Sequence, residues 1–439
     1  MQPPTDAASP KAAAFGMASA VALLVSNQIG TGVFTSLGFQ ALSLHDGFAL
    51  LALWGLGGVL ALCGALCYAE LGAMLPESGG EFVYLSRAWS PTLGFTGGFV
   101  SMTAGFAAPT ALAAMAFGRY VSAVVPVAPM VATCAVLGAV AAIHWRQNAQ
   151  ARAFQVGTTS LTVSVILAFV VTGLLIGPVE PIAFMPSAAS WTEIASAPFA
   201  VSLIYVVYAY HGWNAIGYVA GEIREPQRVI PRAVVLAVLL VAALYLLLHW
   251  VFLRTVPIGA LAGTVEVAAL SATRILGPSG GTVMSGVIAA VLVATISGFL
   301  MAGSRVTQAV CAATPRLEWF GQRSPSGVPR AALGLQLALV ATLIVTASFE
   351  QVLAYTGVVL NLMNLLAVLG VMRLRQTAPS LARPFRVPWY PLPPLLFGAL
   401  SIWMIGFVVA QRPAVLAAAV GTLALGAGVS RLSKLPRAV

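Results

Sequence analysis

Continuous apolar stretches, each long enough to cross a lipid bilayer, recur along almost the whole of this 439-residue chain. The hydrocarbon core of a bilayer is about 30 Å thick, so a spanning helix needs roughly 20 apolar residues. Only 8% of the residues are charged, whereas a soluble domain carries about 25%. The stretches are rich in Ala, Leu, Val and Gly and do not alternate as the strands of a barrel do. They therefore predict transmembrane helices, whose backbone groups are satisfied within each segment.

Twelve membrane spans are predicted from the positions of these stretches. A surface or re-entrant helix near residues 262–276 and an amphipathic piece from Glu81 to Trp89 lie between them. The spans run roughly over residues 13–42, 47–75, 91–118, 129–145, 155–177, 197–221, 233–253, 280–312, 331–348, 350–374, 391–411 and 413–430. The expected fold class is an all-α integral membrane protein.

The basic residues are distributed very unequally between the two sides of the predicted membrane. With the N-terminus inside, cytoplasmic segments carry eighteen Lys and Arg residues and outer segments carry four. Cytoplasmic loops favour Lys and Arg, so both tails, residues 1–12 and 431–439, are expected in the cytoplasm of an inner (plasma) membrane protein. The net charge of +10 forms no clustered patch of the kind that nucleic acid requires. A lipid bilayer, and no nucleic acid, is the expected partner.

Two predicted spans contain helix-breaking residues at mid-membrane. The first reads Ser-Asn-Gln-Ile-Gly-Thr-Gly-Val-Phe over residues 26–34, and the sixth reads Tyr-Ala-Tyr-His-Gly-Trp-Asn-Ala over residues 208–215. Glycine weakens a helix interior by about 1 kcal/mol relative to alanine, and polar side chains there compete for backbone bonds. The breaks lie five spans apart, which predicts two inverted repeats, residues 13–177 and 197–374, followed by two spans over 391–430. Corresponding interrupted helices are typical of a transporter binding site.

Five motifs, in a fixed order, resemble those of a known family. They are Gly-Thr-Gly-Val-Phe at 30–34; Tyr-Ala-Glu-Leu-Gly at 68–72 with Ser-Gly-Gly-Glu-Phe at 78–82; Gly-Trp-Asn at 212–214 with Glu-Ile at 222–223 and Ile-Pro-Arg-Ala at 230–233; Gly-Ser-Arg at 303–305; and Arg-Pro-Phe-Arg-Val-Pro at 383–388. Together they resemble the amino acid–polyamine–organocation (APC) superfamily, and within it the L-type neutral amino acid branch. The resemblance implies a leucine-transporter-like 5+5 inverted repeat in which helices 1 and 6 are broken.

The two breaks together offer both kinds of free backbone group that an amino acid requires. N–H groups at the start of a half-helix suit a carboxylate, and C=O groups at the end of a half-helix suit an ammonium. The predicted carboxylate site, in which the Thr31 hydroxyl is an extra donor, comprises Gly30, Thr31 and Gly32. The predicted ammonium site uses backbone carbonyls near Ile29, Tyr208, Ala209 and His211. The alternative interpretation is helix packing by small residues.

Side chains around the second break are candidates for a gate and a pocket. By the resemblance, Tyr208 holds the position of an aromatic gate, and Thr158 holds a fifth-span position where some members carry a lysine. Trp213 and Asn214 follow the break, and Asn214 either contacts substrate or bonds loose backbone groups. His211 is a proton-coupling group, a residue that narrows the pocket, or a neutral histidine bonded within the unwound segment.

Charged and hydroxyl side chains elsewhere suggest a gate and an ion site. Ionisable groups within membrane proteins are functional candidates by default, and those near cytoplasmic helix ends predict an inner gate made of Glu70, Glu81, Arg87 and Glu222. Thr295 and Ser297 in the eighth span are candidate ligands for a sodium ion between spans one and eight. No other metal site is expected.

Several missing features narrow the function. No acidic residue lies centrally in any predicted span, so a cationic substrate side chain would lack a counter-charge and neutral amino acids are expected. No phosphate-binding loop, His-rich spacing or pair of acids suggests an enzyme or a cofactor. The loop at 119–129 has no cysteine, which animal L-type members use to link a partner. The chain is therefore expected to need no obligatory partner subunit.

The predicted function is secondary active transport of neutral L-amino acids across the inner membrane by alternating access, either as exchange or as ion-coupled symport. Two alternatives stay open: a membrane sensor that binds amino acids without transporting them, and a transporter of amines or polyamines. Because Gly32 lies at the predicted carboxylate site, replacing it by valine should abolish binding. Gly38, beyond the break in the same span, should tolerate the same change much better.

Overall fold

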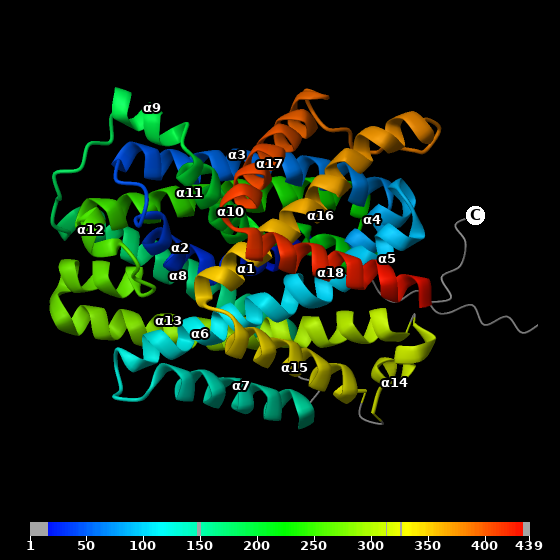
Figure 1. The fold of residues 1–439 in the computed structure, drawn as a ribbon, viewed down its shortest axis with the longest axis horizontal. Coiled ribbons are helices and arrows are strands. Elements are labelled where there is room, and N and C mark those ends of the chain that lie inside the picture. Colours follow the sequence, from blue (N-terminus) through cyan, green and yellow to red (C-terminus); the bar gives the residue numbers. More distant parts are fainter. Residues whose placement is uncertain (1–15, 147–150, 313, 325–326, 433–439) are drawn as a thin grey trace, which may run out of the picture.

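The protein is built from helices, which a computed structural model describes over residues 16–146, 151–312, 314–324 and 327–432 (Figure 1). The predicted tails, residues 1–12 and most of 431–439, lie outside the described residues, as do the side chains of 151–156, 158–159 and 432. The elements are α1 Met17–Gln28, α2 Thr31–Gln40, α3 Gly47–Met74, α4 Glu81–Ala88, α5 Pro91–Val100, the π-helix η1 Ser101–Ala107, α6 Ala108–Ser122, α7 Pro129–Arg146, α8 Ala151–Ile176, α9 Ala188–Ile194, α10 Ala197–Tyr210, the 3-10 helices η2 Trp213–Tyr218 and η3 Ala220–Glu222, α11 Pro226–Thr255, α12 Ile258–Leu261, α13 Val267–Ala312, η4 Pro315–Leu317, α14 Glu318–Gly321, α15 Arg330–Thr346, α16 Phe349–Thr377, α17 Leu392–Gln411 and α18 Pro413–Leu432.

Each predicted span coincides with one or more of these helices. Within the described residues, nine helical runs are long and apolar enough to cross a bilayer, and α9 with α10, bent by 66°, makes a tenth if the pair is one span. The two other predicted spans correspond to shorter apolar helices, Ser160–Ile176 and Arg330–Thr346. The prediction of an all-helical membrane protein with broken helices is confirmed. The boundaries of the two inverted repeats stay a prediction.

The short elements between the spans follow the sequence pattern closely. The amphipathic piece predicted near residue 81 is α4, which runs from Glu81 to Ala88. The helix predicted near 262–276 begins at Val267 and is separated from the rest of α13 by a kink at Gly277, whose φ is 77°. Pro278 follows this left-handed residue and cannot continue the preceding hydrogen-bond ladder. The chain therefore reverses there before the long part of α13 begins.

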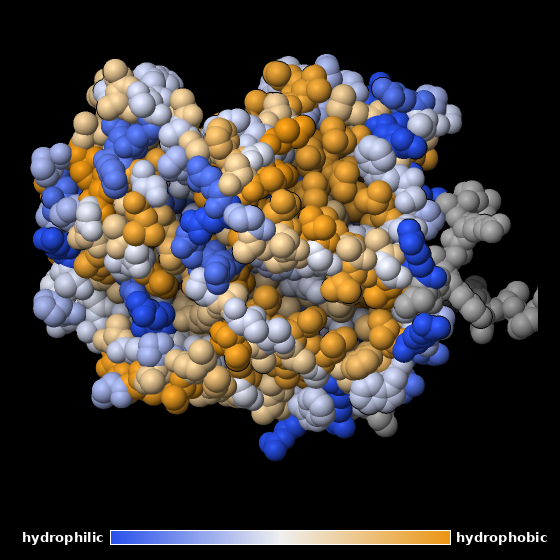
Figure 2. Space-filling model, viewed as in Figure 1, coloured by the Kyte–Doolittle hydropathy of each residue, from blue (hydrophilic) through white to orange (hydrophobic). Residues whose placement is uncertain are grey.

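The segments predicted on opposite sides of the membrane lie at opposite ends of the molecule. In Figure 1, α9 and α12 lie at the left end, whereas α4 and α14 lie at the right end. Figure 2 shows apolar surface over much of the face between these ends, and hydrophilic residues at both ends and in a group left of the centre. Large apolar side chains are exposed on the long helices, among them Leu175, Val283, Val345 and Ile402. This distribution fits a bilayer around the middle of the molecule.

The third span contains a π-helical turn that was not predicted from the sequence. Residues Ser101–Ala107 form a π-helical turn between α5 and α6. A π turn widens the helix by one residue and is frequent at functional sites. Here the turn packs against α13, α15 and α16, and it carries Ser101 and Gly105 into the wall of a central cavity.

Candidate functional site

The first break leaves the start of a helix open toward a cavity. α1 ends at Gln28, Ile29 and Gly30 are extended, and α2 begins at Thr31 without a side-chain cap. The first N–H groups of any helix have no partner within the helix, so this end is a ready anion site. A Cβ atom built on Gly30 meets no other atom within 4 Å, which means that the backbone there faces open space.

The second break depends on one glycine. α10 ends at Tyr210, and Gly212 has a φ of 128°, a conformation that L side chains rarely adopt. A Cβ atom on Gly212 would lie 2.5 Å from the carbonyl carbon and oxygen of Asn27. The two broken spans therefore cross in direct backbone contact. Beyond the break the chain continues as the 3-10 helices η2 and η3, whereas the sequence predicted a span as far as residue 221.

A tyrosine from a third helix joins the carbonyl ends of both broken spans. The hydroxyl of Tyr245, on α11, lies 2.7 Å from the carbonyl oxygen of Gln28 and 3.0 Å from that of Ala209. Its ring packs between Trp54 and Tyr210, with centroid distances of 5.6 and 4.9 Å. Tyr245 was not predicted as a site residue, because the sequence around it does not indicate which distant carbonyl groups its hydroxyl will bind.

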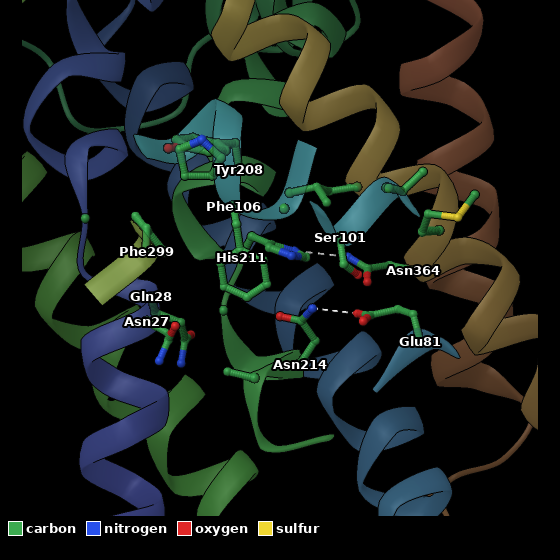
Figure 3. A pocket seen from close by; sticks show the side chains of 18 of the residues that line it. Asn27, Gln28, Glu81, Ser101, Phe106, Tyr208, His211, Asn214, Phe299 and Asn364 are labelled. Atoms are coloured by element: carbon green, nitrogen blue, oxygen red, sulfur yellow. Dashed lines mark hydrogen bonds between the residues drawn. The ribbon is translucent and has the colours of Figure 1, made fainter. Parts of the chain in front are cut away.

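Both breaks line one cavity, which also borders α4, α5, η1, α6, α13 and α16 (Figure 3). The residues of the broken spans that line it are Asn27, Gln28, Gly30, Thr31, Gly32, Tyr208, Ala209, His211, Gly212, Asn214, Ala215 and Tyr218. Other helices contribute Glu81, Gly97, Val100, Ser101, Gly105, Phe106, Pro109, Phe299, Leu360, Met363 and Asn364. Most of the residues singled out at the two breaks thus surround the same space.

Two residues predicted around the breaks do not line this cavity. Ile29 is 4% exposed and packs in the core. Trp213, which follows Gly212 at the start of η2, is absent from the cavity wall and packs edge-on against Tyr68 of α3 with the ring centroids 4.7 Å apart. Its assignment to the pocket is wrong. The side chain of Thr158 lies outside the described residues.

The candidate gate residue Tyr208 reaches across to the first break. Its hydroxyl lies 3.2 Å from the hydroxyl of Thr31, and either group can donate. Both side chains are buried. This bond joins α10 to the first turn of α2, so the two broken spans are linked by side chains as well as by backbone.

His211 is bonded to another span. Its Nδ1 atom lies 3.2 Å from the amide nitrogen of Asn364 on α16, and Figure 3 shows the two side chains turned toward each other. Because the Asn364 amide donates, Nδ1 of His211 acts as the acceptor, so the imidazole is neutral and carries its proton on Nε2. The bond is therefore not made within the unwound segment, as one interpretation of the sequence had it.

The carboxylate of Glu81 lies in the wall of the cavity, where the sequence predicted no acid. Asn214 donates to its Oε1 at 2.5 Å, Tyr218 donates to its Oε2 at 2.6 Å, and Tyr68 donates to Oε1 at 3.2 Å. Glu81 is 3% exposed. The expectation failed because Glu81 belongs to the short helix α4 and not to a span, and α4 packs inward against α5 and α16.

The predicted inner gate separates into independent groups. Glu70 is fully buried and is held by Arg375 at 2.6 Å, by Arg383 at 3.7 Å and by the N–H of Val387 at 2.7 Å. Arg87 pairs with the exposed Glu77 at 3.3 Å. Glu222 is exposed. These residues and Glu81 share no bond among the described contacts, so the four do not form one network.

The two hydroxyls proposed for a sodium ion are engaged elsewhere. Thr295 donates to the carbonyl of Val291 in its own helix at 3.1 Å. Ser297 lies 2.8 Å from Nε2 of His144 on α7, and neither hydroxyl lines the cavity. The predicted sodium site is therefore not supported. Among the described residues, no group of three or more His, Cys, Asp or Glu side chains is arranged to hold a metal ion.

The prediction that Gly38 tolerates substitution by valine better than Gly32 is wrong. A Cβ atom on Gly38 would collide with the backbone carbonyl of Thr264, and the N–H of Gly263 bonds to Gly38 at 2.8 Å. On Gly32 it would lie 2.7 Å from Cβ of Ala209. Gly38 is thus a close-packing position and no mild control, and Gly32 also packs against α10. Gly30 is the position at which an added side chain enters only the cavity.

The fold and the cavity define a multi-pass membrane transporter whose site lies between two broken helices. A family model described as amino acid permease matches residues 15–426. The chain belongs to this family, which confirms the resemblance to the APC superfamily, and it is an amino acid transporter and not an enzyme.

Relatives are found in the L-type branch. The chain is 24% identical over 409 residues to the human b(0,+)-type amino acid transporter 1, covering 91% of this chain and 83% of the relative. It is 25% identical over 411 residues to the serine/threonine exchanger SteT of Bacillus subtilis (strain 168), covering 89% and 90%. The mouse Asc-type amino acid transporter 1 is 26% identical over 393 residues, covering 85% and 72%.

Proposed function

We propose that this chain transports neutral L-amino acids by alternating access, as an exchanger or an ion-coupled symporter. The observation that carries the proposal is that both helix breaks line one cavity. The start of α2 is bonded to α10 through Thr31 and Tyr208, and Tyr245 joins the carbonyl ends of α1 and α10, so one site offers groups of opposite polarity. Exchange is supported by the relative named as a serine/threonine exchanger.

The substrate carboxylate is assigned to the first turn of α2, at Gly30, Thr31 and Gly32. The ammonium is assigned to the carbonyls of Tyr208, Ala209 and His211, which line the cavity, and no longer to that of Ile29, which does not line it. Ala209 already accepts from Tyr245, and Tyr208 accepts from the N–H of His211 at 3.0 Å. A carbonyl oxygen has two lone pairs, so an ammonium can share these acceptors.

Neutral substrates are supported by the state of Glu81. Glu81 is the one acid among the described residues that line the cavity, and its two oxygens already accept three hydrogen bonds, so a cationic side chain would have to displace these donors to pair with it. Arginine and lysine should therefore compete poorly with alanine, serine or leucine for uptake. Inhibition by arginine as strong as that by the neutral amino acids would contradict this part of the proposal.

The direction in which the cavity extends supports an inward-facing form. Its wall includes Glu81, Gly97 and Tyr218, which belong to segments predicted near the cytoplasmic side. On the other side of the breaks, Tyr208 and Thr31 are bonded across the path. We assign this pair to the outer gate.

Transport is tested by counterflow in proteoliposomes. Vesicles loaded with one neutral amino acid should accumulate a labelled one against its gradient, and vesicles without protein should not. A protein that binds neutral amino acids in detergent and gives no flux would instead support the sensor alternative. Flux of putrescine without flux of any amino acid would support the amine alternative.

We also propose an inner-membrane location with both termini in the cytoplasm, and function without an obligatory second subunit. The unequal distribution of Lys and Arg supports the orientation. A reporter that is active only in the periplasm, fused after Val439, should stay inactive. Counterflow by the chain purified alone would support the second point, and flux that needs a co-purified protein would contradict it.

A further inference from the structure

Glu81 is the centre of a hydrogen-bonded chain that contains no cation. Its partners are the uncharged side chains of Tyr68, Asn214 and Tyr218, at 3.2, 2.5 and 2.6 Å. None of the ion pairs among the described residues includes Glu81. A buried carboxylate without a cation is costly when ionised and much less so when protonated.

One arm of the chain leads from Glu81 to the histidine of the cavity. The hydroxyl of Tyr68 lies 3.2 Å from Oε1 of Glu81 and 3.0 Å from Oδ1 of Asn364. The amide nitrogen of Asn364 lies 3.2 Å from Nδ1 of His211. A hydroxyl has one proton, so Tyr68 can donate fully either to Glu81 or to Asn364.

The other arm leads to the π turn of the third span. The hydroxyl of Tyr218 lies 2.6 Å from Oε2 of Glu81 and 2.8 Å from the hydroxyl of Ser101. Ser101 in turn lies 3.0 Å from the carbonyl oxygen of Gly97. Each of these hydroxyls therefore also has two possible directions for its single proton.

The same heavy-atom positions satisfy the hydrogen bonds of Glu81 in both its ionised and its protonated form. When the carboxylate is ionised, Tyr68 and Tyr218 both donate to it. When Oε2 carries a proton, that proton is donated to Tyr218, which turns its own proton to Ser101, and Ser101 donates to the carbonyl of Gly97. Tyr68 then donates to Asn364. Rotation of three hydroxyl groups is sufficient for the change.

We propose that Glu81 is a proton-binding site and that one proton binds together with each amino acid. This inference rests on the proposed transport function. The ionised Glu81 and the substrate carboxylate would be like charges in one cavity, which disfavours their simultaneous presence. Protonation of Glu81 removes this repulsion, so substrate binds better when Glu81 is neutral.

Among the acids near the cavity, Glu81 is the one whose protonation can change with pH without breaking an ion pair. Four titratable side chains face it or its chain: Tyr68 from α3, Tyr84 from α4, Tyr218 from η2 and His211 beyond Asn364. Burial, and secondly the charge of Glu81, raises the pKa of Tyr84, so that phenol stays neutral.

η1 and α16 present Ser101 and Asn364, which do not titrate. The charged groups on the neighbouring helix faces are engaged elsewhere: Glu70 with Arg375 and Arg383, Glu77 with Arg87, and Arg373 over the ring of Trp89.

Glu81 also touches the part of the second broken span that lies beyond the break. Asn214 and Tyr218 both belong to η2, and each is bonded to the carboxylate. Neutralising Glu81 weakens these charge-assisted bonds. Proton binding therefore loosens the same contacts that hold η2 against α4, which links the proton to movement of the broken helix.

The wild-type protein in proteoliposomes provides the first test. An imposed pH gradient, acidic outside, should drive accumulation of labelled alanine, and an internal pH dye should report proton entry with the amino acid. Counterflow of alanine without any response to the pH gradient would overturn the proton inference and leave the transport function intact. No counterflow at all would instead remove the transport function on which the inference rests.

Substitutions locate the proton. In the wild type, alanine affinity should fall as pH rises above the midpoint, by up to about tenfold per pH unit, the limit for one linked proton. Glu81→Gln should make the affinity independent of pH. Glu77→Gln, which changes an exposed acid paired with Arg87, should keep the wild-type profile. A wild-type pH profile in Glu81→Gln would overturn the assignment.

A second substitution keeps the assignment testable if Glu81→Gln does not fold. Tyr218→Phe removes one donor to the carboxylate and leaves Glu81 in place. Loss of a donor disfavours the ionised form, so the midpoint of the affinity profile should move to higher pH. A midpoint that is unchanged or moves to lower pH in Tyr218→Phe would contradict a proton on Glu81.

Discussion

The two helix breaks differ in how much of their free backbone is already used. At the first break only Ile29 and Gly30 are extended, and α2 starts again at Thr31 with its first turn uncapped. At the second break Gly212 has a positive φ of 128°, and the chain continues as 3-10 helices, so no α-helix follows at once. The carbonyl of Ala209 is occupied by Tyr245, and that of Tyr208 by the N–H of His211.

This difference suggests separate roles for the two breaks. The residues that start α2 line the cavity without any side-chain cap, so the carboxylate half of the proposed site would be preformed. The carbonyl half is held by Tyr245, which bonds both broken spans at once. We expect substitutions in the first turn of α2 to change substrate affinity, and loss of the Tyr245 hydroxyl to change mainly the stability of the substrate-free protein.

The largest effect is expected at Gly30. Valine there places its side chain in the open space that faces the cavity and should cost at least one charge-assisted bond to the carboxylate. Such a bond contributes about 1.5–3 kcal/mol, or roughly 10- to 150-fold in affinity. Calorimetric titration with a neutral amino acid measures this loss.

The matched control for Gly30 is Gly138 on α7. A Cβ atom on Gly138 also meets nothing within 4 Å, and this residue is exposed and lines no part of the cavity. Gly138→Val should bind like the wild type. Equal loss of affinity in both variants would show that valine acts through the fold and not through the carboxylate site.

The next largest effect is expected for Tyr245→Phe, and on stability. The change leaves the carbonyls of Gln28 and Ala209 without their shared donor, and a buried unsatisfied group costs about 1–3 kcal/mol. The melting temperature of the substrate-free protein should fall. Stabilisation by added amino acid should be kept, because an ammonium can take the freed carbonyls.

A second tyrosine serves as the control for Tyr245. The hydroxyl of Tyr355 on α16 lies 2.9 Å from Thr422, and no hydrogen bond among the described residues joins it to either break. Tyr355→Phe should lower the melting temperature less than Tyr245→Phe does. The comparison of the two breaks would be contradicted if the two tyrosine variants melted alike.

The smallest effect is expected for the hydroxyl bond between the breaks. Tyr208→Phe removes its bond to Thr31 but keeps the ring, which should cost about 0.5–1.5 kcal/mol, or roughly 2- to 12-fold in affinity. Thr31→Val should act on the same bond, so the double variant should lose less than the two losses combined. Strictly additive losses would mean that the bond does not hold the gate.

The sequence predicted the fold well because the constraints on it are local. Each span is recognised from its own apolar length, and each break from its own glycines and polar residues. The first break is placed within a residue or two by Gly30 and Gly32. Likewise, α4 and the kinked helix at Gly277 are visible from amphipathicity and from a Gly-Pro pair.

The site was predicted less completely because its other walls come from distant segments. Tyr245, Asn364 and Glu81 lie in α11, α16 and α4, and nothing in the sequence around them indicates that they meet the breaks. Glu81 was placed at a helix end near water, whereas the inward packing of α4 buries it at the cavity. Trp213 was misplaced because its neighbour in the fold, Tyr68, belongs to a distant helix that the sequence around Gly212 does not indicate.

The central claim is that the first turn of α2 binds the substrate carboxylate. The most direct measurement is the ratio of affinities for an amino acid and for its amide, which lacks that charge, in the wild type and in Gly30→Val. The wild type should favour the amino acid by about 10- to 150-fold, as expected for one charge-assisted bond, and in Gly30→Val the ratio should fall toward one. An unchanged ratio in a folded Gly30→Val protein would contradict the account.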